Sequence, residues 1–333
     1  MEGVMKDINK QLTDQMLNTY LDLEKAFIWE NNLSKHFTAL ILTQSNKRVS
    51  KENIKSALDV INQNTSVFSN FRGLYRFMIA GLMNAESDSV EGTFSRVLAC
   101  ENHLKQVGFK NGTHLPIAAY TLYRASKTES NAALAQKSFE VYSLMKSNHP
   151  FLTSSDDYAM AILLAQSGGD LSRIENIYEK LHANGFYQGN ALQMLSHILA
   201  LSNKDEDLIV EVCLNLKNQL KINHLTLSST FYASLGIVAL INIEDPSILG
   251  EWIEVSHYLN KQKKYKWLGK GMNVLLASAI VSDQWIKEHE MESLSNSAIG
   301  LTVESLIAAQ MAALVAASTA AATAAAASNS AAT

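Results

Sequence analysis

One pattern occurs in two stretches of the chain, CENHLKQVGFKNGTHLPIAAYTLY (residues 100–123) and YEKLHANGFYQGNALQMLSHILAL (residues 178–201), and it indicates the fold. They share a leucine, a Gly-Phe pair, a second glycine and two further leucines at a constant offset of 77 residues, from Leu104 to Leu181 onward. Each begins as an amphipathic helix that we expect to end at the Gly-Phe pair, because glycine can adopt the left-handed conformation that closes a helix. A short polar turn and a more apolar helix follow. Each stretch therefore predicts a helical hairpin.

The same unit recurs more loosely in YSLMKSNHPFLTSSDDYAMAILLA (residues 142–165) and more weakly between Leu214 and Leu240. The spacing of about 36 to 41 residues lies in the range of tetratricopeptide-like and related helical repeats, although the tetratricopeptide signature itself is absent. A single hairpin cannot bury its apolar face alone, so neighbouring units must stack. The pattern predicts an all-α protein of stacked antiparallel hairpins, an irregular α-solenoid with tetratricopeptide-like repeats.

Elsewhere in the chain, apolar residues at three- and four-residue steps predict helices over 6–29, 33–42, 248–259 and 270–285, and a mostly buried helix over 70–83. Ser50 is placed to cap another helix that follows it. The repeat rhythm begins near Ser89, and the composition changes to alanine-rich sequence at Ser305. We therefore expect an N-terminal helical region (1–88), a helical-repeat region (89–304) and an alanine-rich C-terminal helix or tail (305–333).

The composition bounds the class of protein. Only 3 prolines and 15 glycines occur in 333 residues, which favours long helices over turn-rich β structure. A net charge of −4 argues against nucleic acid as a partner, and the lysines between Lys261 and Lys270 are interpreted as a solvated helix end. Cys100 and Cys213 are far apart in apolar patterns, as expected of small buried side chains in a reducing compartment. With no apolar signal segment and no convincing membrane span, the sequence predicts a cytoplasmic protein without a membrane partner.

The alanine-rich tail permits three interpretations. Its apolar line (Leu306, Ala309 or Gln310, Ala313, Ala317) could dock or self-associate through small side chains that let backbones approach closely. It could equally be a partly ordered low-complexity terminus. A membrane tail anchor is the minor alternative, because alanine, serine and threonine contribute little transfer free energy.

Two local groups contain candidate site residues. In HPFLTSSDDYA (149–159), a serine or threonine can cap the next helix while Asp156 and Asp157 occupy its positive first turn. The same acids beside His149 could instead bind a metal ion, although adjacent acids at a helix start diverge.

The second group lies in GNALQMLSHILAL (189–201), where Asn190, Gln193 and His197 share one helical face. Buried polar side chains need hydrogen-bond partners, so this line predicts either a network between repeats or a stripe that contacts a ligand or peptide.

These blocks also resemble a known family. HPFLTSSDDYAMAILLA (149–165), GNALQMLSHILAL (189–201) and IAAQMAALVAA (307–317), preceded by FRGLYRFMIAGLM (71–83) and GFKNGTHLPIAAYTLY (108–123), are similar to motifs of the bacterial domain-of-unknown-function family numbered four thousand and three. The chain departs from that pattern at Ser154, Ser155 and Met311. The resemblance implies a bacterial cytoplasmic protein and supplies no activity.

The sequence is compatible with three functions. The first is a non-catalytic scaffold that binds a protein or peptide, because hairpin repeats occur without a recognisable catalytic motif or cofactor-binding motif. The second is a metal-dependent or small-molecule-processing enzyme using His149, Asp156, Asp157 and His197. The third is RNA binding, suggested by a faint likeness of residues 178–186 to pentatricopeptide helices and weakened by the acidic balance. No cofactor is expected.

Overall fold

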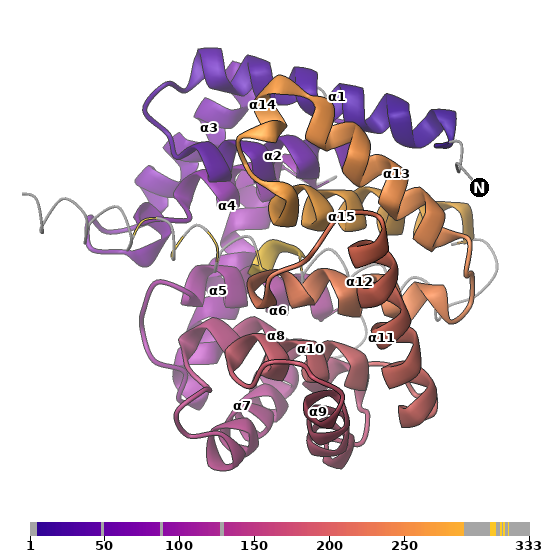
Figure 1. Cartoon of the computed structure of the whole chain (residues 1–333). Coiled ribbons are helices and arrows are strands. Elements are labelled where there is room, and N and C mark those ends of the chain that lie inside the picture. Colours follow the sequence, from indigo (N-terminus) through magenta and orange to yellow (C-terminus); the bar gives the residue numbers. More distant parts are fainter. Residues whose placement is uncertain are drawn as a thin grey trace, which may run out of the picture.

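The computed structural model describes residues 5–47, 50–86, 89–126, 130–289 and 307–310, together with Leu314, Ala316 and Thr319. All regular structure in this part of the chain is helical, and these residues contain no strand (Figure 1). The predicted all-α class is confirmed. Most of the predicted tail, including Leu306, Ala313 and Ala317, lies outside the described residues.

The described helices alternate between an outer and an inner row. The outer row is α1 (Asp7–Ala26), α3 (Lys51–Asn64), α5 (Val90–Val107), α7 (Asn131–Asn148), α9 (Ser172–Ala183), α11 (Glu206–Ile222) and α13 (Ile248–Lys261). The inner row is α2 (Asn32–Gln44), α4 (Arg76–Ala85), α6 (Leu115–Ala125), α8 (Tyr158–Ser167), α10 (Asn190–Ala200), α12 (Tyr232–Asn242) and α15 (Lys270–His289). The short helices η1 (Asn70–Arg72), η2 (Ser155–Asp157), η3 (Ser229–Phe231) and α14 (Lys263–Lys266) lie between the rows.

Each outer helix packs against the inner helix that follows it, which gives seven hairpins in the described residues. The outer helices are amphipathic, whereas inner helices such as α4, α6 and α12 are buried nearly all round. A helix that is apolar on every side needs neighbours on every side. The inner row is therefore covered by its own outer helices and by adjacent hairpins.

The Gly-Phe pairs end helices as the sequence predicts. Gly108 and Gly185 have φ of +118° and +82°, and the backbone N–H of the next residue, Phe109 or Phe186, donates to a carbonyl five residues back. Both phenylalanines are buried. In the weaker copy His224 takes the left-handed position, with φ +58°. Glycine and histidine thus close different helices with the same left-handed backbone conformation, followed in each case by a buried apolar side chain.

The first and last hairpins meet, so the succession closes into a ring (Figure 1). The α15 helix contacts both α1 and α2, and α13 contacts α1. The Lys264 ammonium lies 2.7 Å from the Glu24 carboxylate, and the Tyr258 hydroxyl donates to Asp14 over 2.5 Å. The tetratricopeptide-like solenoid remains a prediction. In the described helices, successive hairpins stack, and the first hairpin contacts the last.

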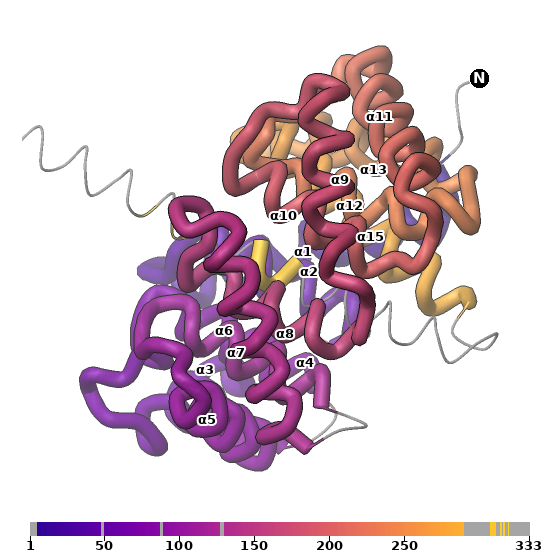
Figure 2. Tube along the Cα trace, turned by 90° about the horizontal axis from the view of Figure 1, so that it is seen from below, coloured from indigo at the N-terminus to yellow at the C-terminus, as the bar shows by residue number. Residues whose placement is uncertain are grey.

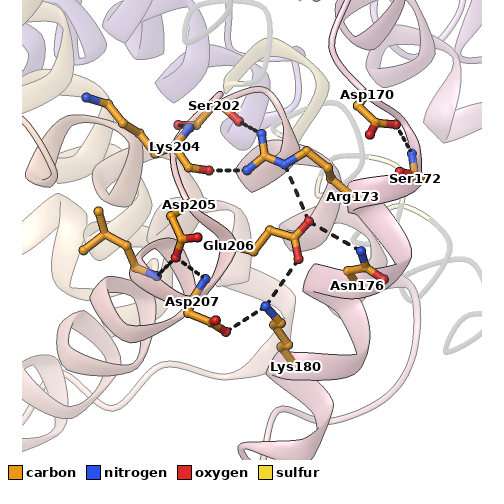
Figure 3. A network of polar contacts seen from close by, with 11 residues as sticks. Asp170, Ser172, Arg173, Asn176, Lys180, Ser202, Lys204, Asp205, Glu206 and Asp207 are labelled. Carbon is orange, nitrogen blue, oxygen red and sulfur yellow. Dashed lines mark hydrogen bonds and ion pairs between the residues drawn. The ribbon is translucent and has the colours of Figure 1, made fainter.

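Polar contacts also tie neighbouring outer helices together. Figure 3 shows the Glu206 carboxylate, at the start of α11, between Arg173 and Lys180 of α9, with nitrogen–oxygen distances of 3.7 and 3.3 Å. The Arg173 guanidinium also donates to the carbonyls of Ser202 and Lys204. Arg173 therefore joins α9 to the loop between α10 and α11.

Candidate functional site

Seven loops lead from an outer helix into the next inner helix, and they gather at one end of the ring. We call them the entry rim: residues 27–31, 65–75, 108–114, 149–157, 184–189, 223–231 and 262–269. Each of the first six loops contacts a residue of the hairpin that follows it, and these contacts join Glu30 to Arg76, Asn70 to Asn111, Lys110 to Tyr158, Thr153 to Gln193, Gly185 to Lys217, and His224 to Lys270. The inner helices therefore point their N-termini toward the same end of the molecule.

Four of the six predicted site residues lie on or beside this rim. His149, Asp156 and Asp157 belong to the loop before α8, and Asn190 is the exposed first residue of α10. Gln193 and His197 lie deeper, and both are 1 % exposed. The predicted polar line of α10 therefore divides into an exposed end and a buried part.

Gln193 connects two hairpins. Its side-chain amide donates to the Thr153 hydroxyl over 2.8 Å, and Thr153 in turn donates to the Met145 carbonyl over 3.1 Å. The other end of the Gln193 side chain, Oε1, is buried without a protein partner. A buried acceptor without a partner costs desolvation free energy. Gln193 is therefore held by one side-chain bond between two hairpins, and one of its acceptors has no protein partner.

His197 lies next to the hydrogen-bonded pair of His149 and Glu175. His149 Nε2 and Glu175 Oε2 are 2.9 Å apart, and the His149 ring packs 5.2 Å from the ring of Tyr178. Glu175 and His197 both line a cavity of about 10 Å³, which is room for about one water molecule. Burial lowers the pKa of His197 to about 3, and the nearby His149 adds to this effect. His197 is therefore neutral at physiological pH, and its Nδ1 is buried without a protein partner.

The two aspartates differ in environment. Asp157 is buried and accepts a hydrogen bond from the Ser154 backbone N–H over 2.9 Å, while Asp156 is half-buried and accepts one from the Ser154 hydroxyl. Burial, and then the charge of Asp156, raise the pKa of Asp157 to about 7, against the opposing Ser154 bond. Both acids therefore bond to the turn that starts α8, in agreement with the predicted capping role. Asp157 can also gain or lose a proton near neutral pH.

Sequence reasoning missed a polar pair on the neighbouring hairpins. Tyr75, just before α4, and His114, just before α6, bring Oη and Nδ1 to 3.2 Å. Burial lowers the pKa of His114, although the field of Asp156 acts in the opposite direction. The sequence feature that could have revealed this pair is that Tyr75 and His114 each lie directly before an inner helix, at equivalent positions of their hairpins. The loops of three successive hairpins thus bring Tyr75, His114 and Asp156 together.

The rim does not assemble a metal centre within the described ranges, where no group of three or more His, Cys, Asp or Glu side chains is placed to hold an ion. His149 is paired with Glu175, and Asp157 with the backbone of its own turn. The residues of the predicted enzyme alternative therefore have separate partners. Within the same ranges, no helix has the length and hydropathy needed to cross a bilayer.

A short piece of the alanine-rich segment lies inside the ring. In Figures 1 and 2 the yellow segment that includes residues 307–310 runs among the inner helices. Ile307 and Ala308 are each 1 % exposed, and the Gln310 side chain donates to the carbonyl of Thr230, on the entry rim, over 3.0 Å. The middle of the ring therefore holds an apolar helical segment of the same chain.

Comparison with known proteins agrees with the resemblance of the sequence blocks. The model of the family described as "Protein of unknown function (DUF4003)" matches residues 19–312. The chain is 28 % identical over 310 residues to "Uncharacterized protein YeaA" of Bacillus subtilis (strain 168), covering 90 % of this chain and 91 % of that protein. No solved structure matches. Because the family model spans most of the chain, the protein belongs to the DUF4003 family of proteins of unknown function.

Proposed function

We propose that this protein is a non-catalytic helical-repeat scaffold, and that the middle of its ring binds a short apolar helix of a protein partner. The observation that carries the proposal is the burial of residues 307–310 among the inner helices. In this proposal the hairpins are repeat units of an irregular solenoid, and closing the solenoid turns its concave face into the interior of a ring.

The contacts of the internal segment indicate what such a site selects. Ile307 is buried as a large apolar side chain, Ala308 and Ala309 allow close backbone approach, and Gln310 supplies one directional hydrogen bond to Thr230. An amphipathic helix in an apolar groove is a recurring mode of peptide recognition, in which residues at helical spacing act as anchors. The partner class is therefore a helix with one bulky aliphatic residue followed by small residues and an amide.

The proposal places the protein in the cytoplasm. Cys100 and Cys213 are both free and buried, as expected where thiols stay reduced. A second copy of the chain is a possible source of the partner helix, because its own alanine-rich segment has the required sequence.

The test uses a fluorescein-labelled peptide of residues 304–319 and the full-length protein. In the wild type, the internal segment competes at a high effective concentration, since only residues 290–306 separate it from α15. Ile307→Asp in the protein should expel its own segment and tighten peptide binding by about 10²-fold or more, measured by fluorescence polarisation.

Two controls accompany this measurement. A peptide carrying the same Ile307→Asp change should not bind, and Leu208→Asp on the exposed face of α11 should leave the affinity of the wild type unchanged. The proposal fails if the Ile307→Asp protein keeps its helical circular dichroism and still does not bind the peptide.

A further inference from the structure

Exposed large apolar side chains are concentrated on the entry rim. Within the described residues, those more than half exposed are Ile28, Trp29, Val67, Phe68, Phe151, Tyr187, Ile222 and Trp267. All of them lie in entry-rim loops except Ile222, which is the residue before one. The others exposed by more than a third, Ile8, Leu144 and Leu208, lie on outer helices and are 37 to 44 % exposed. The opposite end of the ring therefore lacks this feature among the described residues.

Five aromatic side chains of the entry rim are exposed and do not pack against one another. Trp29, Phe68, Phe151, Tyr187 and Trp267 come from five different hairpins and are 77 to 98 % exposed. None of the ring–ring contacts between described residues involves any of them. A protein interface usually presents a contiguous apolar patch. Separate exposed aromatic side chains around one rim instead fit a deformable surface, because each side chain can insert into such a surface without contacting the others.

The charge of the rim differs from that of the whole chain. The rim carries the cations Arg72, Lys110, Lys263, Lys264 and Lys266 and the acids Glu30, Asp156 and Asp157. Each acid is engaged within the protein, Glu30 by Arg76 over 3.0 Å and both aspartates by Ser154. Lys110, Lys263 and Lys266 are exposed on the rim surface. The chain as a whole has a net charge of −4, so positive charge is collected at this end.

The opposite rim, formed by the loops from inner to outer helices, has the reverse balance. Its described residues include five acids and two lysines, namely Glu86, Asp170, Asp205, Glu244, Asp245, Lys47 and Lys204. The molecule therefore has one end with exposed aromatics and free lysines and one end that is acidic. Such a polarity orients a protein toward an anionic surface.

We propose that, contrary to the absence of a membrane partner predicted from the sequence, the entry rim binds the surface of an anionic lipid bilayer, with the aromatic side chains in the headgroup region and the lysines over acidic lipids. Trp, Tyr and Phe partition to this interface because their rings are apolar and their edges tolerate water. Lysines near an anionic leaflet add electrostatic attraction. The few free cations are too sparse for a nucleic-acid surface, which needs many neutralised phosphates. This proposal does not rest on the function proposed for the middle of the ring.

The experiment is co-sedimentation of the full-length protein with vesicles of phosphatidylcholine alone or mixed with phosphatidylglycerol. The wild type should bind the mixed vesicles and be released by salt. Each of Lys263→Gln and Lys266→Gln should lower the partition coefficient about fivefold, because a cation near an anionic leaflet contributes about 1 kcal/mol. Trp29→Ser/Phe68→Ser/Trp267→Ser should abolish binding, while the matched Ile8→Ser/Leu208→Ser protein should bind like the wild type.

Tryptophan emission gives an independent readout. Trp29 and Trp267 are 94 % and 86 % exposed, whereas Trp252 and Trp285 are buried. Mixed vesicles should therefore shift the emission to the blue, and Trp29→Phe/Trp267→Phe should remove that shift while vesicle binding persists. The proposal is overturned if the wild type stays in the supernatant at low salt with every lipid composition. It is also overturned if the rim and control variants bind alike; a protein partner would then be the occupant of the aromatic rim.

Discussion

The side-chain amide of Gln193 donates a hydrogen bond of 2.8 Å to the hydroxyl of Thr153, across 40 residues of sequence and between two successive hairpins. Both side chains are buried, and Thr153 passes the bond on to the Met145 carbonyl. The α10 helix is thereby fixed against the loop that starts α8. The residues predicted from the sequence as a candidate ligand stripe thus include one that links two successive hairpins.

This bond gives a prediction about stability. Thr153→Val removes the hydroxyl and leaves the Gln193 amide unsatisfied, which should lower the free energy of unfolding by about 1–3 kcal/mol. The double variant Thr153→Val/Gln193→Leu should recover most of that loss, because both polar partners are gone and the Met145 carbonyl still accepts from the His149 backbone N–H. Urea unfolding of the four proteins in the cycle measures the coupling. Additive effects of the two changes would show that the bond contributes nothing.

Asp157 should make stability fall as pH rises. Its pKa is raised from 3.8 to about 7 in the folded protein, so the folded state binds more protons than the unfolded state between these values. The stabilisation is complete below pH 3.8 and is lost through pH 7, by about 1.4 kcal/mol per pH unit. Asp157→Asn keeps an acceptor for the Ser154 N–H and cannot ionise, so the wild type should lose stability relative to this variant across that window. Parallel pH profiles of the two proteins would contradict the prediction.

His36 and His197 should act in the opposite direction. Burial lowers the pKa of each from 6.5 to about 3, so the unfolded state binds the extra proton between these values. Stability is complete above pH 6.5 and falls as the solution is acidified, by about 1.4 kcal/mol per pH unit for each histidine. His197→Gln should flatten the acid limb of the profile. The measurement is the unfolding free energy of wild type and variant at several values of pH, and an unchanged difference between them would refute it.

Gly81 of α4 packs directly against Thr38 of α2. A Cβ atom at this position would lie 2.7 Å from Cγ2 and 2.8 Å from Oγ1 of Thr38. Gly81→Ala should therefore destabilise the protein by about 1–3 kcal/mol through overpacking, despite the better helix propensity of alanine. Thermal unfolding followed by circular dichroism measures the loss.

The same site provides its own control. Thr38 is buried and its hydroxyl has no protein partner, so Thr38→Ala removes the two atoms nearest to the added Cβ, one of them an unsatisfied polar atom, and leaves only its own Cβ at 3.1 Å. Thr38→Ala/Gly81→Ala should consequently be more stable than Gly81→Ala alone. If the double variant is less stable still, contact with Thr38 is not the cause.

The local structure could be predicted from the amino-acid sequence. Apolar periodicity located the helices, Ser50 caps α3 by accepting from the Asn53 backbone N–H, and the Gly-Phe pairs end α5 and α9 as left-handed closures. The signals are local, since a cap or a helix end depends on residues within one turn. The paired aspartates before α8 were likewise interpretable as part of a capping turn, because their partner Ser154 is adjacent.

The arrangement of the hairpins, and the identity of the polar residues buried between them, could not be predicted without the three-dimensional structure. Apolar periodicity predicts which face of a helix is buried, but it does not predict the angle between one hairpin and the next. These angles, added over seven hairpins, determine whether the first and last hairpins meet. Closure depends on contacts such as Tyr258 with Asp14, which lie 244 residues apart in the chain. The same closure brings loops that are distant in sequence to one rim, so the gathering of Trp29 and Trp267 with the other aromatics has no local signature. Helix ends and caps depend on neighbouring residues, so the sequence predicts each hairpin. The entry rim and the middle of the ring depend on contacts between distant residues, so they are visible only once the hairpins are packed.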